Sequence, residues 1–171
     1  DDTNLNDFYS EIYHKRWDIW EAFLLLWEAQ QLIGEIGEQT LLCTEYLQER
    51  WRKVGVIPYP HQIQTALKVV HQLHGRALLA DEVGLGKTIE AGLIIKEYLL
   101  RGLIKNCLIL TPASLGRQWH TELHEKFDLW FTLIKKPADW INSEFIICSI
   151  DTAKKGAHAE TALSRYFDLL V

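Results

Sequence analysis

The segment LLADEVGLGKTIEAGLIIKEYL, at residues 78–99, has the pattern of a strand, a tight glycine turn and a helix. In a phosphate loop of the form GxxxxGK[ST], backbone amides surround a phosphate, the lysine reaches the outer phosphates and the Ser/Thr hydroxyl holds magnesium. Lys87 and Thr88 fit the last two roles, and Gly84 and Gly86 supply the backbone freedom of the turn. The segment therefore predicts a nucleotide phosphate site between a strand and a helix of an α/β fold.

The first position of this pattern is Asp81 and not glycine. The alternative interpretation is a glycine turn that merely caps a helix. That alternative does not explain why Lys87 and Thr88 follow the turn together. The strand expected before the turn and the helix expected after it favour the phosphate loop.

From residue 55 onward, expected strands alternate with expected helices. Pro60 opens a helix that Gly75 closes, a second helix runs from the loop to Leu100, and Ser114 is expected to begin a third. Strands are expected at residues 77–80, 107–110, 130–134 and 145–150, a further helix around 158–166, and the start of a strand at 169–171. This alternation predicts a parallel sheet covered by helices on both faces.

The N-terminal part, residues 1–54, differs from the rest in charge and in pattern. Residues 1–52 carry a net charge of −7, and the remainder carries +2. Apolar residues recur at helical spacing over residues 5–27, two glycines interrupt the pattern, and a second helix carries Leu42, Tyr46 and Trp51. We expect a helical hairpin whose aromatic stripe packs on the rest of the protein, with a groove that binds a protein partner as the alternative.

The composition limits the possible settings of the chain. Its longest plain apolar run, residues 22–27, is far shorter than the roughly 20 residues that span a membrane, and no signal sequence opens it. We therefore expect a cytoplasmic protein with no membrane partner. The three cysteines lie in apolar settings and are expected to be buried thiols. The absence of methionine favours a piece of a longer chain.

Nucleotide hydrolysis also requires a carboxylate at the tip of a neighbouring strand to hold magnesium. Asp151 ends the apolar run at residues 145–150 and is the best acid on pattern alone. Its rival is an acid beyond the C-terminus. A different phosphate-loop protein, such as a small kinase that uses Asp151 as its magnesium acid, is therefore an alternative.

Two further clusters are weaker. His120 and His124 have the spacing of a metal pair, but no third ligand is apparent and a solvated helix face is the simpler interpretation. Two lysine pairs, at residues 135–136 and 154–155, could face the phosphates of a nucleic acid. With a net charge of −5, the chain alone is expected to bind DNA weakly.

Four blocks occur in an order that resembles the Swi/Snf-related branch of the superfamily-two helicase-like ATPases: IPYPHQ at 57–62, LLADEVGLGKTIEAGLI at 78–94, CLILTPASLGRQWHTEL at 107–123 and FIICSIDTAKK at 145–155. The chain is most similar to the bacterial branch that includes the RNA polymerase recycling ATPase. An Asp-Glu pair before Gly-Leu-Gly-Lys-Thr belongs to this family's version of the loop, so Asp81 supports the resemblance. The match covers residues 55–171.

The resemblance implies ATP and magnesium as cofactors, with Thr88 as the magnesium ligand and Lys87 and Thr88 as catalytic residues. Gln62 falls on the glutamine that reads the adenine edge, a task suited to an amide with a donor side and an acceptor side. The remaining cofactor-binding positions implied by the resemblance are Asp81, Glu82, Val83, Gly84, Leu85 and Gly86.

In this family the third block touches one nucleic-acid strand, which implies Thr111, Ser114 and Arg117 as contacts. Ser114 as a helix cap and Thr111 as a strand end are the structural alternatives. By the same resemblance, Asp151 faces nucleic acid and the magnesium-binding Asp-Glu pair follows Val171.

The implied fold is a truncated RecA-like parallel sheet with flanking helices, preceded by the hairpin. Residues 55–171 would form the first part of the N-terminal ATPase lobe. The longer protein is expected to close two lobes over ATP and magnesium and to move along double-stranded DNA, displacing RNA polymerase or another DNA-bound protein. The piece alone is expected to be inactive.

Overall fold

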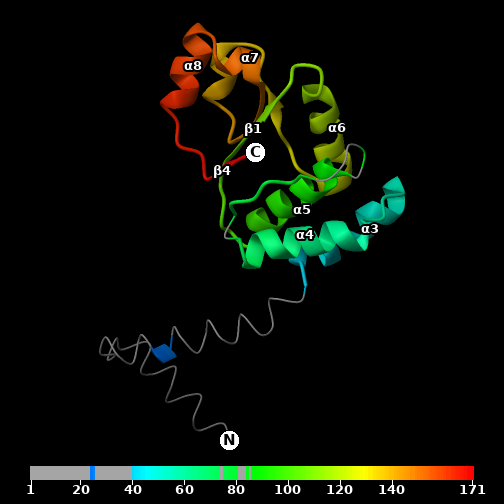
Figure 1. Cartoon of the computed structure of the whole chain (residues 1–171). Helices are drawn as coiled ribbons and strands as arrows, with labels where there is room; N and C mark the ends of the chain where they lie inside the picture. The colour runs from blue at the N-terminus through cyan, green and yellow to red at the C-terminus, as the bar shows by residue number, and fades with distance from the viewer. Residues whose placement is uncertain (1–23, 26–39, 74, 81–83, 85) are drawn as a thin grey trace, which may run out of the picture. The chain divides into compact units, whose positions relative to one another are not determined.

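The computed structural model describes residues 24–25, 40–73, 75–80, 84 and 86–171, and the chain divides into two compact units, Asp1–Gln39 and Thr40–Val171 (Figure 1). In the first unit only Leu24 and Leu25 are described, and both are helical. The first helix of the expected hairpin therefore lies almost entirely outside the described residues.

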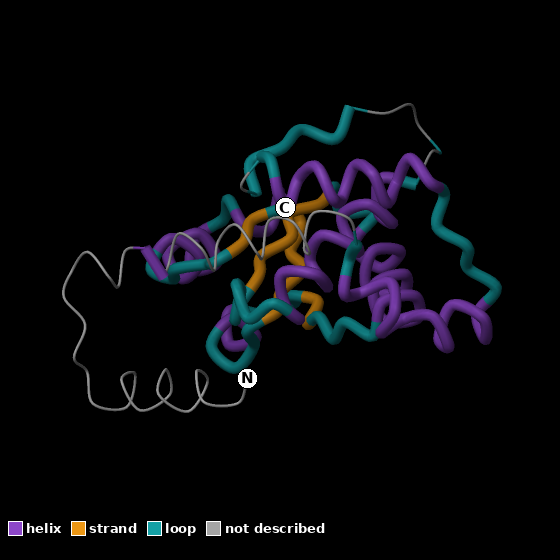
Figure 2. The backbone as a smooth tube through the Cα atoms, turned by 90° about the horizontal axis from the view of Figure 1, so that it is seen from below, coloured by secondary structure: helices purple, strands orange, loops and turns teal. Residues whose placement is uncertain are grey.

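The second unit is built on a four-stranded sheet. The strands are β1 (Cys107–Thr111), β2 (Thr132–Leu133), β3 (Phe145–Ser149) and β4 (Leu169–Leu170), in the order β2-β3-β1-β4. All three pairings are parallel, with Thr111 opposite Ser149 and Cys107 opposite Leu169. Figure 2 shows the strands running side by side among the helices. The predicted α/β fold with a parallel sheet is confirmed.

Helices cover both faces of this sheet. One apolar cluster contains Cys107, Ile109 and Ile147 with buried residues of the helices α3 (Leu42–Val54), α4 (Pro60–His71), α5 (Lys87–Leu100) and α6 (Gly116–Phe127). The alternate strand residues Leu108, Ile146 and Cys148 join a second cluster with Trp140 of the 3₁₀ helix η1 (Pro137–Trp140). This second face also carries α7 (Ile150–Ala153) and α8 (Gly156–Leu163), across β1 and β4 from α4 and α5 (Figure 1). The period of two along each strand thus assigns neighbouring residues to opposite cores.

The strand expected at residues 77–80 is not present. Residues 76–80 have no regular secondary structure and pair with none of the strands that the structure describes. A strand requires a neighbour at hydrogen-bonding distance. A cavity lined by Ala77 and Leu79 on one side and by Leu169 and Leu170 on the other separates this segment from β4. The prediction of a strand at residues 77–80 was therefore wrong, because the apolar pattern alone does not supply a pairing partner.

The start of α6 also differs from the prediction. Ser114 does not cap the helix, because Leu115 occupies the cap position and its amide donates to the carbonyl of Pro112 at 3.0 Å. The turn after β1 therefore uses a backbone hydrogen bond where the sequence suggested a side-chain cap. Similarly, β2 begins at Thr132 and leaves Trp130 72% exposed outside the strand.

Helix α3 packs within the second unit, although the sequence analysis placed it in the N-terminal hairpin. Its buried side carries Cys43, Leu47 and Trp51, whereas Leu42 and Tyr46 are about half exposed. The indole Nε1 of Trp51 donates to the carbonyl of Lys126 at 2.8 Å and ties α3 to the end of α6. The division between the units, after Gln39, thus differs from the domain boundary expected after residue 54.

A buried carboxylate holds the first turn of α3 on α5. Glu97, fully buried in α5, accepts the backbone amides of Leu42 at 3.1 Å and Cys43 at 2.9 Å. Its Oε1 atom also accepts Nε of Arg101 at 2.7 Å. Because Leu41 provides no side-chain cap for α3, Glu97 satisfies amides that a capping residue would otherwise serve.

The three cysteines are buried and free, as expected from the sequence. Burial raises the pKa of the Cys107 thiol to about 12 and that of Cys148 to about 11. Burial, together with the nearby Glu97 carboxylate, also raises the pKa of Cys43. All three thiols therefore stay protonated at neutral pH and are poor nucleophiles.

Candidate nucleotide and nucleic-acid site

The glycine turn before α5 has the backbone geometry that a phosphate loop requires. Gly84 has φ +96° and Gly86 has φ +85°, conformations that strain residues with a Cβ atom. Gly86 caps α5, and its carbonyl accepts the amides of Ile89 at 2.7 Å and Glu90 at 3.2 Å. The predicted loop residues Asp81, Glu82, Val83 and Leu85 lie outside the described residues.

Lys87 and Thr88 form the first turn of α5 and are half-buried. The first amides of any α-helix have no intrahelical acceptor, and the helix dipole makes this end positive. The turn provides no side-chain cap for α5. The structure thus joins an uncapped helix N-terminus, a lysine and a hydroxyl, which together suit an anion and its metal ion.

Gln62 lies against this loop. This residue is 3% exposed, and its side-chain Oε1 accepts the backbone amide of Tyr59 at 2.9 Å. On its other side, a Cβ atom added to Gly86 would lie 2.4 Å from Nε2 of Gln62. The structure therefore brings Gln62, from the first turn of α4, against Gly86, which lies beyond the end of that helix in the sequence. It also shows that Gln62 serves as a structural cap for α4.

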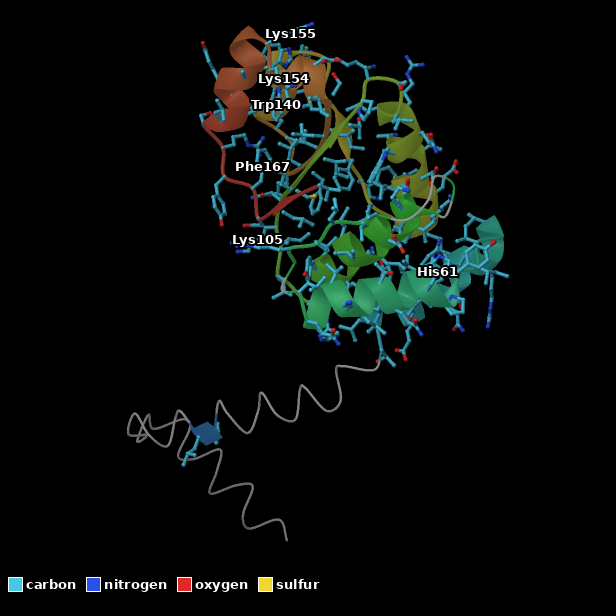
Figure 3. The ribbon with its side chains drawn as sticks, in the orientation of Figure 1. His61, Lys105, Trp140, Lys154, Lys155 and Phe167 are labelled. Atoms are coloured by element: carbon cyan, nitrogen blue, oxygen red, sulfur yellow. The ribbon has the colours of Figure 1, made fainter. Side chains whose placement is uncertain are left out.

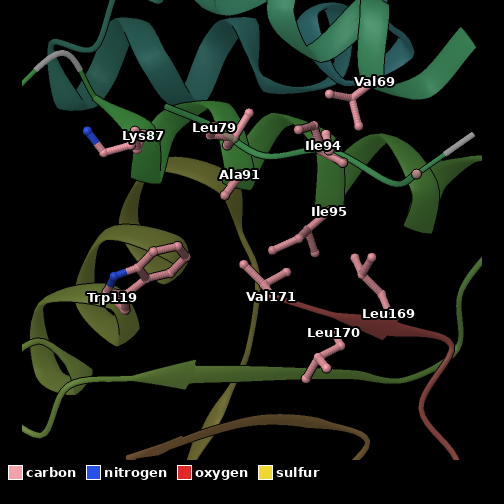
Figure 4. Close-up of a pocket in the computed structure, with 12 residues that line it drawn as sticks. Val69, Leu79, Lys87, Ala91, Ile94, Ile95, Trp119, Leu169, Leu170 and Val171 are labelled. Atoms are coloured by element: carbon pink, nitrogen blue, oxygen red, sulfur yellow. The ribbon is translucent and has the colours of Figure 1, made fainter. Parts of the chain in front are cut away.

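An apolar cavity of about 370 Å³ opens beside the loop. Figure 4 shows Lys87 and Trp119 at one end of it, with α5 along one side and Leu169, Leu170 and Val171 opposite. The structure places Trp119 of α6 half-buried on the cavity wall, which it shares with Lys87. Helical spacing alone contains no information about this neighbour.

The three residues expected to contact nucleic acid gather where β1 leads into α6. Ser114 and Arg117 are exposed in the turn and in the first turn of α6. Thr111, however, is only 2% exposed, and its hydroxyl has no hydrogen-bond partner among the described residues. That hydroxyl would lie 3.5 Å from a Cβ atom at Gly116, so it sits beneath the N-terminus of α6. The α6 cap also makes no side-chain hydrogen bond.

Asp151 was the best magnesium acid on sequence pattern alone. It is exposed in α7, directly after β3, and β1 separates β3 from the edge strand β4. Asp151 does not line the cavity that contains Lys87. The geometry therefore gives no support to Asp151 as the magnesium acid of this loop.

The structure also shows what surrounds the two lysine pairs and the histidine pair that the sequence singled out. The amides of Lys135 and Lys136 donate to Asp139 and hold the pKa of its carboxyl below the ordinary value. Lys154 and Lys155 lie at the far end of the unit from His61 of α4 (Figure 3). The His124 ring packs on Trp130 with 4.0 Å between ring centroids. In the described part of the chain, no three His, Cys, Asp or Glu side chains are grouped to hold a metal ion.

A parallel sheet covered on both faces, with a glycine turn opening α5, defines a RecA-like α/β domain. The family model of the SNF2-related domain matches residues 43–135, and the chain belongs to this family. The chain is 45% identical to the uncharacterized ATP-dependent helicase YqhH of Bacillus subtilis (strain 168), over 91% of the chain and 27% of that protein. It is 39% identical to the RNA polymerase-associated protein RapA of Histophilus somni (strain 129Pt), over 71% of the chain and 14% of that protein.

The chain therefore spans about a quarter or less of the length of these relatives. None of the helices in the described ranges combines the length and the apolar character needed to cross a membrane.

Proposed function

We propose that the chain binds ATP with magnesium at the loop of Gly84–Thr88 and that it belongs to a protein that uses ATP hydrolysis to move along double-stranded DNA. The observation that carries the nucleotide part is the contact between Gln62 and Gly86. An amide with both a donor and an acceptor stands directly beside a glycine turn, an uncapped helix N-terminus and a lysine. The relative named as an ATP-dependent helicase supports the same assignment.

Each residue of the loop has a separate task in this proposal. The amides that begin α5 and the ammonium group of Lys87 bind the phosphate oxygens, and the hydroxyl of Thr88 holds magnesium. Magnesium neutralises charge on the phosphates when it is bound. The absence of a Cβ at Gly86 leaves Gln62 room to reach the loop. Gln62 then fixes the adenine edge, because its amide can donate to N7 and accept from N6.

The nucleic-acid part rests on the junction of β1 and α6. Arg117, Ser114 and the uncapped amides of α6 offer donors to a backbone phosphate, and the unpartnered hydroxyl of Thr111 lies beneath them. We propose that double-stranded DNA contacts this junction in the longer protein. RNA polymerase or another DNA-bound protein is the proposed partner, because one relative is named as RNA polymerase-associated. We further propose that turnover requires residues of the longer protein.

Gln62 provides the test of adenine recognition. Gln62→Glu keeps an oxygen for the Tyr59 amide but removes the NH₂ donor, so we expect the ratio of ATP to GTP affinity to fall about tenfold. Gln62→Ala should lose this selectivity and also about 1 kcal/mol of stability, because the cap of α4 is lost. Titration calorimetry with both nucleotides measures the ratio. If Gln62→Glu weakened the binding of ATP and GTP equally, the negative charge of the new glutamate would explain the loss. Gln62 would then cap α4 without reading the base.

Arg117 provides the test of phosphate contact. Arg117→Ala is expected to weaken binding of a DNA duplex several-fold and to reduce the slope of log affinity against log salt by about one. Fluorescence anisotropy at a series of salt concentrations measures both quantities. Arg52→Ala, which removes an exposed cation from α3, is the matched control. Equal effects of the two substitutions would show that Arg117 contributes only general charge.

A further inference from the structure

Lys87 stands at one end of an otherwise apolar cavity. Among the described residues that line this cavity of about 370 Å³, Lys87 is the only one with a charged side chain. Ala91 and Ile94, which follow it at helical spacing on α5, line the cavity too. The Lys87 side chain therefore leaves α5 on the face that borders the apolar space, and Figure 4 shows its amino group directed away from Ile94 and Ile95.

A lysine side chain at such a border can turn its stem into the apolar space or keep its amino group at the open end. Burial of an ammonium group in apolar surroundings is costly, whereas the methylene stem is compatible with them. A lysine that is free to rotate also loses rotamer freedom when a ligand immobilises it, and this loss weakens binding. A wall that holds the stem in one position before the ligand arrives therefore raises the affinity for a phosphate.

Trp119 of α6 lies where such a wall is needed. Its half-buried indole lines the same end of the cavity as Lys87 (Figure 4). Trp119, Leu123 and Phe127 recur at every fourth residue along one side of α6. This row ends at Phe127, whose ring lies so close to α5 that a Cβ atom added to Gly92 would be 2.4 Å from it. The side of α6 that carries Trp119 is therefore packed tightly on α5 at its other end.

The C-terminal end of α6 is also held from α3. Nη1 of Arg50 donates to the carbonyl of His124 at 3.2 Å, and the Trp51 indole donates to the carbonyl of Lys126 at 2.8 Å. The last carbonyls of a helix have no intrahelical donor, so these bonds satisfy groups that need a partner. Contacts far from the glycine turn thus fix α6, and they set the position of Trp119 without any contribution from a nucleotide.

We propose that Trp119 is a positioning residue for Lys87. Its indole blocks rotation of the lysine stem into the cavity and so keeps the amino group beside the loop of Gly84–Thr88. This proposal rests on the proposed nucleotide site, and it adds a residue of α6 that acts on the phosphates through Lys87 alone. Because the amino group binds phosphates and not the base, the effect of Trp119 is the same for a nucleotide and for a bare polyphosphate.

The test measures affinities for Mg·ATP and for magnesium with inorganic tripolyphosphate by calorimetry on the full 171-residue chain. Trp119→Ala is expected to weaken both ligands about tenfold, because the freed lysine stem must be immobilised on binding. In the Lys87→Ala background the same change should have less than about a twofold effect, since no amino group is left to position. Trp119→Phe keeps an aromatic wall and should retain most of the affinity.

Trp130→Ala is the matched control. It removes a 72% exposed tryptophan that does not line the cavity, and it should change neither affinity. Urea unfolding checks that each variant is folded. If Trp119→Ala is not folded, Trp119→Leu takes its place, because leucine is apolar but has no ring, and it should weaken both ligands more than Trp119→Phe does.

If Trp119→Ala bound both ligands as well as the unsubstituted chain while Lys87→Ala did not, the positioning role alone would be overturned. Equal loss in the presence and absence of Lys87 would overturn it as well, because Trp119 would then only support the fold. Loss of ATP affinity without loss of tripolyphosphate affinity would mean that Trp119 contacts the base. If Lys87→Ala itself left both affinities unchanged, the proposed nucleotide site would fail, and the positioning role with it.

Discussion

Replacement of Lys87 by alanine is expected to lower the affinity of the chain for Mg·ATP by about 100-fold. Lys87 begins α5 directly after the αL glycine Gly86, so its side chain leaves the backbone at the positive end of the helix. A hydrogen bond to a charged group contributes about 1.5–3 kcal/mol, and about 1.4 kcal/mol corresponds to a tenfold change in affinity. Calorimetric titration of both proteins with Mg·ATP measures the difference.

Lys68→Ala is the control for this substitution. Lys68 is an exposed lysine in the last turn of α4, so its loss removes the same charge from the opposite end of this helix to Gln62. Its ATP affinity should stay within about twofold of the unsubstituted chain, because exposed charges interact weakly through water. If Lys87→Ala bound ATP as well as Lys68→Ala, the phosphates would have to lie elsewhere.

Gly92→Ala is expected to destabilise the second unit by about 2 kcal/mol, the largest stability effect that we predict for a single methyl group. Gly92 is buried in α5, and the fully buried ring of Phe127 in α6 lies directly over it. A Cβ atom at Gly92 would come within 2.4–2.7 Å of three ring carbons. The higher helix propensity of alanine offsets only about 1 kcal/mol of the resulting strain. Urea unfolding measures the change in free energy.

A second-site change separates this clash from other effects. Phe127→Leu shortens the side chain over Gly92, so Gly92→Ala should cost less in the Phe127→Leu background than in the original chain. Gly116→Ala serves as a comparison, since a Cβ there would meet its nearest neighbour, Leu133, at an ordinary 3.4 Å. The same loss of stability for Gly92→Ala in both backgrounds would contradict close packing of α5 on α6.

Periodicity within the sequence predicted the parts of the fold that depend on local pattern. The alternation at residues 107–110 and 145–150 corresponds to β1 and β3, and Pro60 does begin α4. Alternating strands and helices correctly predicted a parallel sheet covered on both faces. These features follow from side-chain direction and chain connectivity, which the sequence contains.

Contacts between distant residues were not predictable in the same way. Glu97 holds the start of α3 from a position 54 residues beyond Cys43, so no local pattern could assign α3 to the second unit. The strand wrongly predicted at residues 77–80 has the same explanation, because a strand forms only beside a partner at hydrogen-bonding distance.

The candidate site was predictable in part. The sequence identified the glycine turn and, by resemblance, Gln62, but only the structure shows Gln62 against Gly86. The burial of Thr111 was not predicted either, because a buried threonine and an exposed threonine at the end of a strand have the same sequence pattern.

Binding of ATP at the glycine turn can be tested by mapping the bound nucleotide on the backbone amides. We would titrate the ¹⁵N-labelled chain with Mg·ATP and follow its amide resonances by NMR. We expect saturable shifts that are largest at Gly84, Gly86, Lys87 and Thr88, together with the side-chain NH₂ of Gln62. Saturation with the largest shifts elsewhere, or no shifts at millimolar Mg·ATP, would contradict binding at the glycine turn.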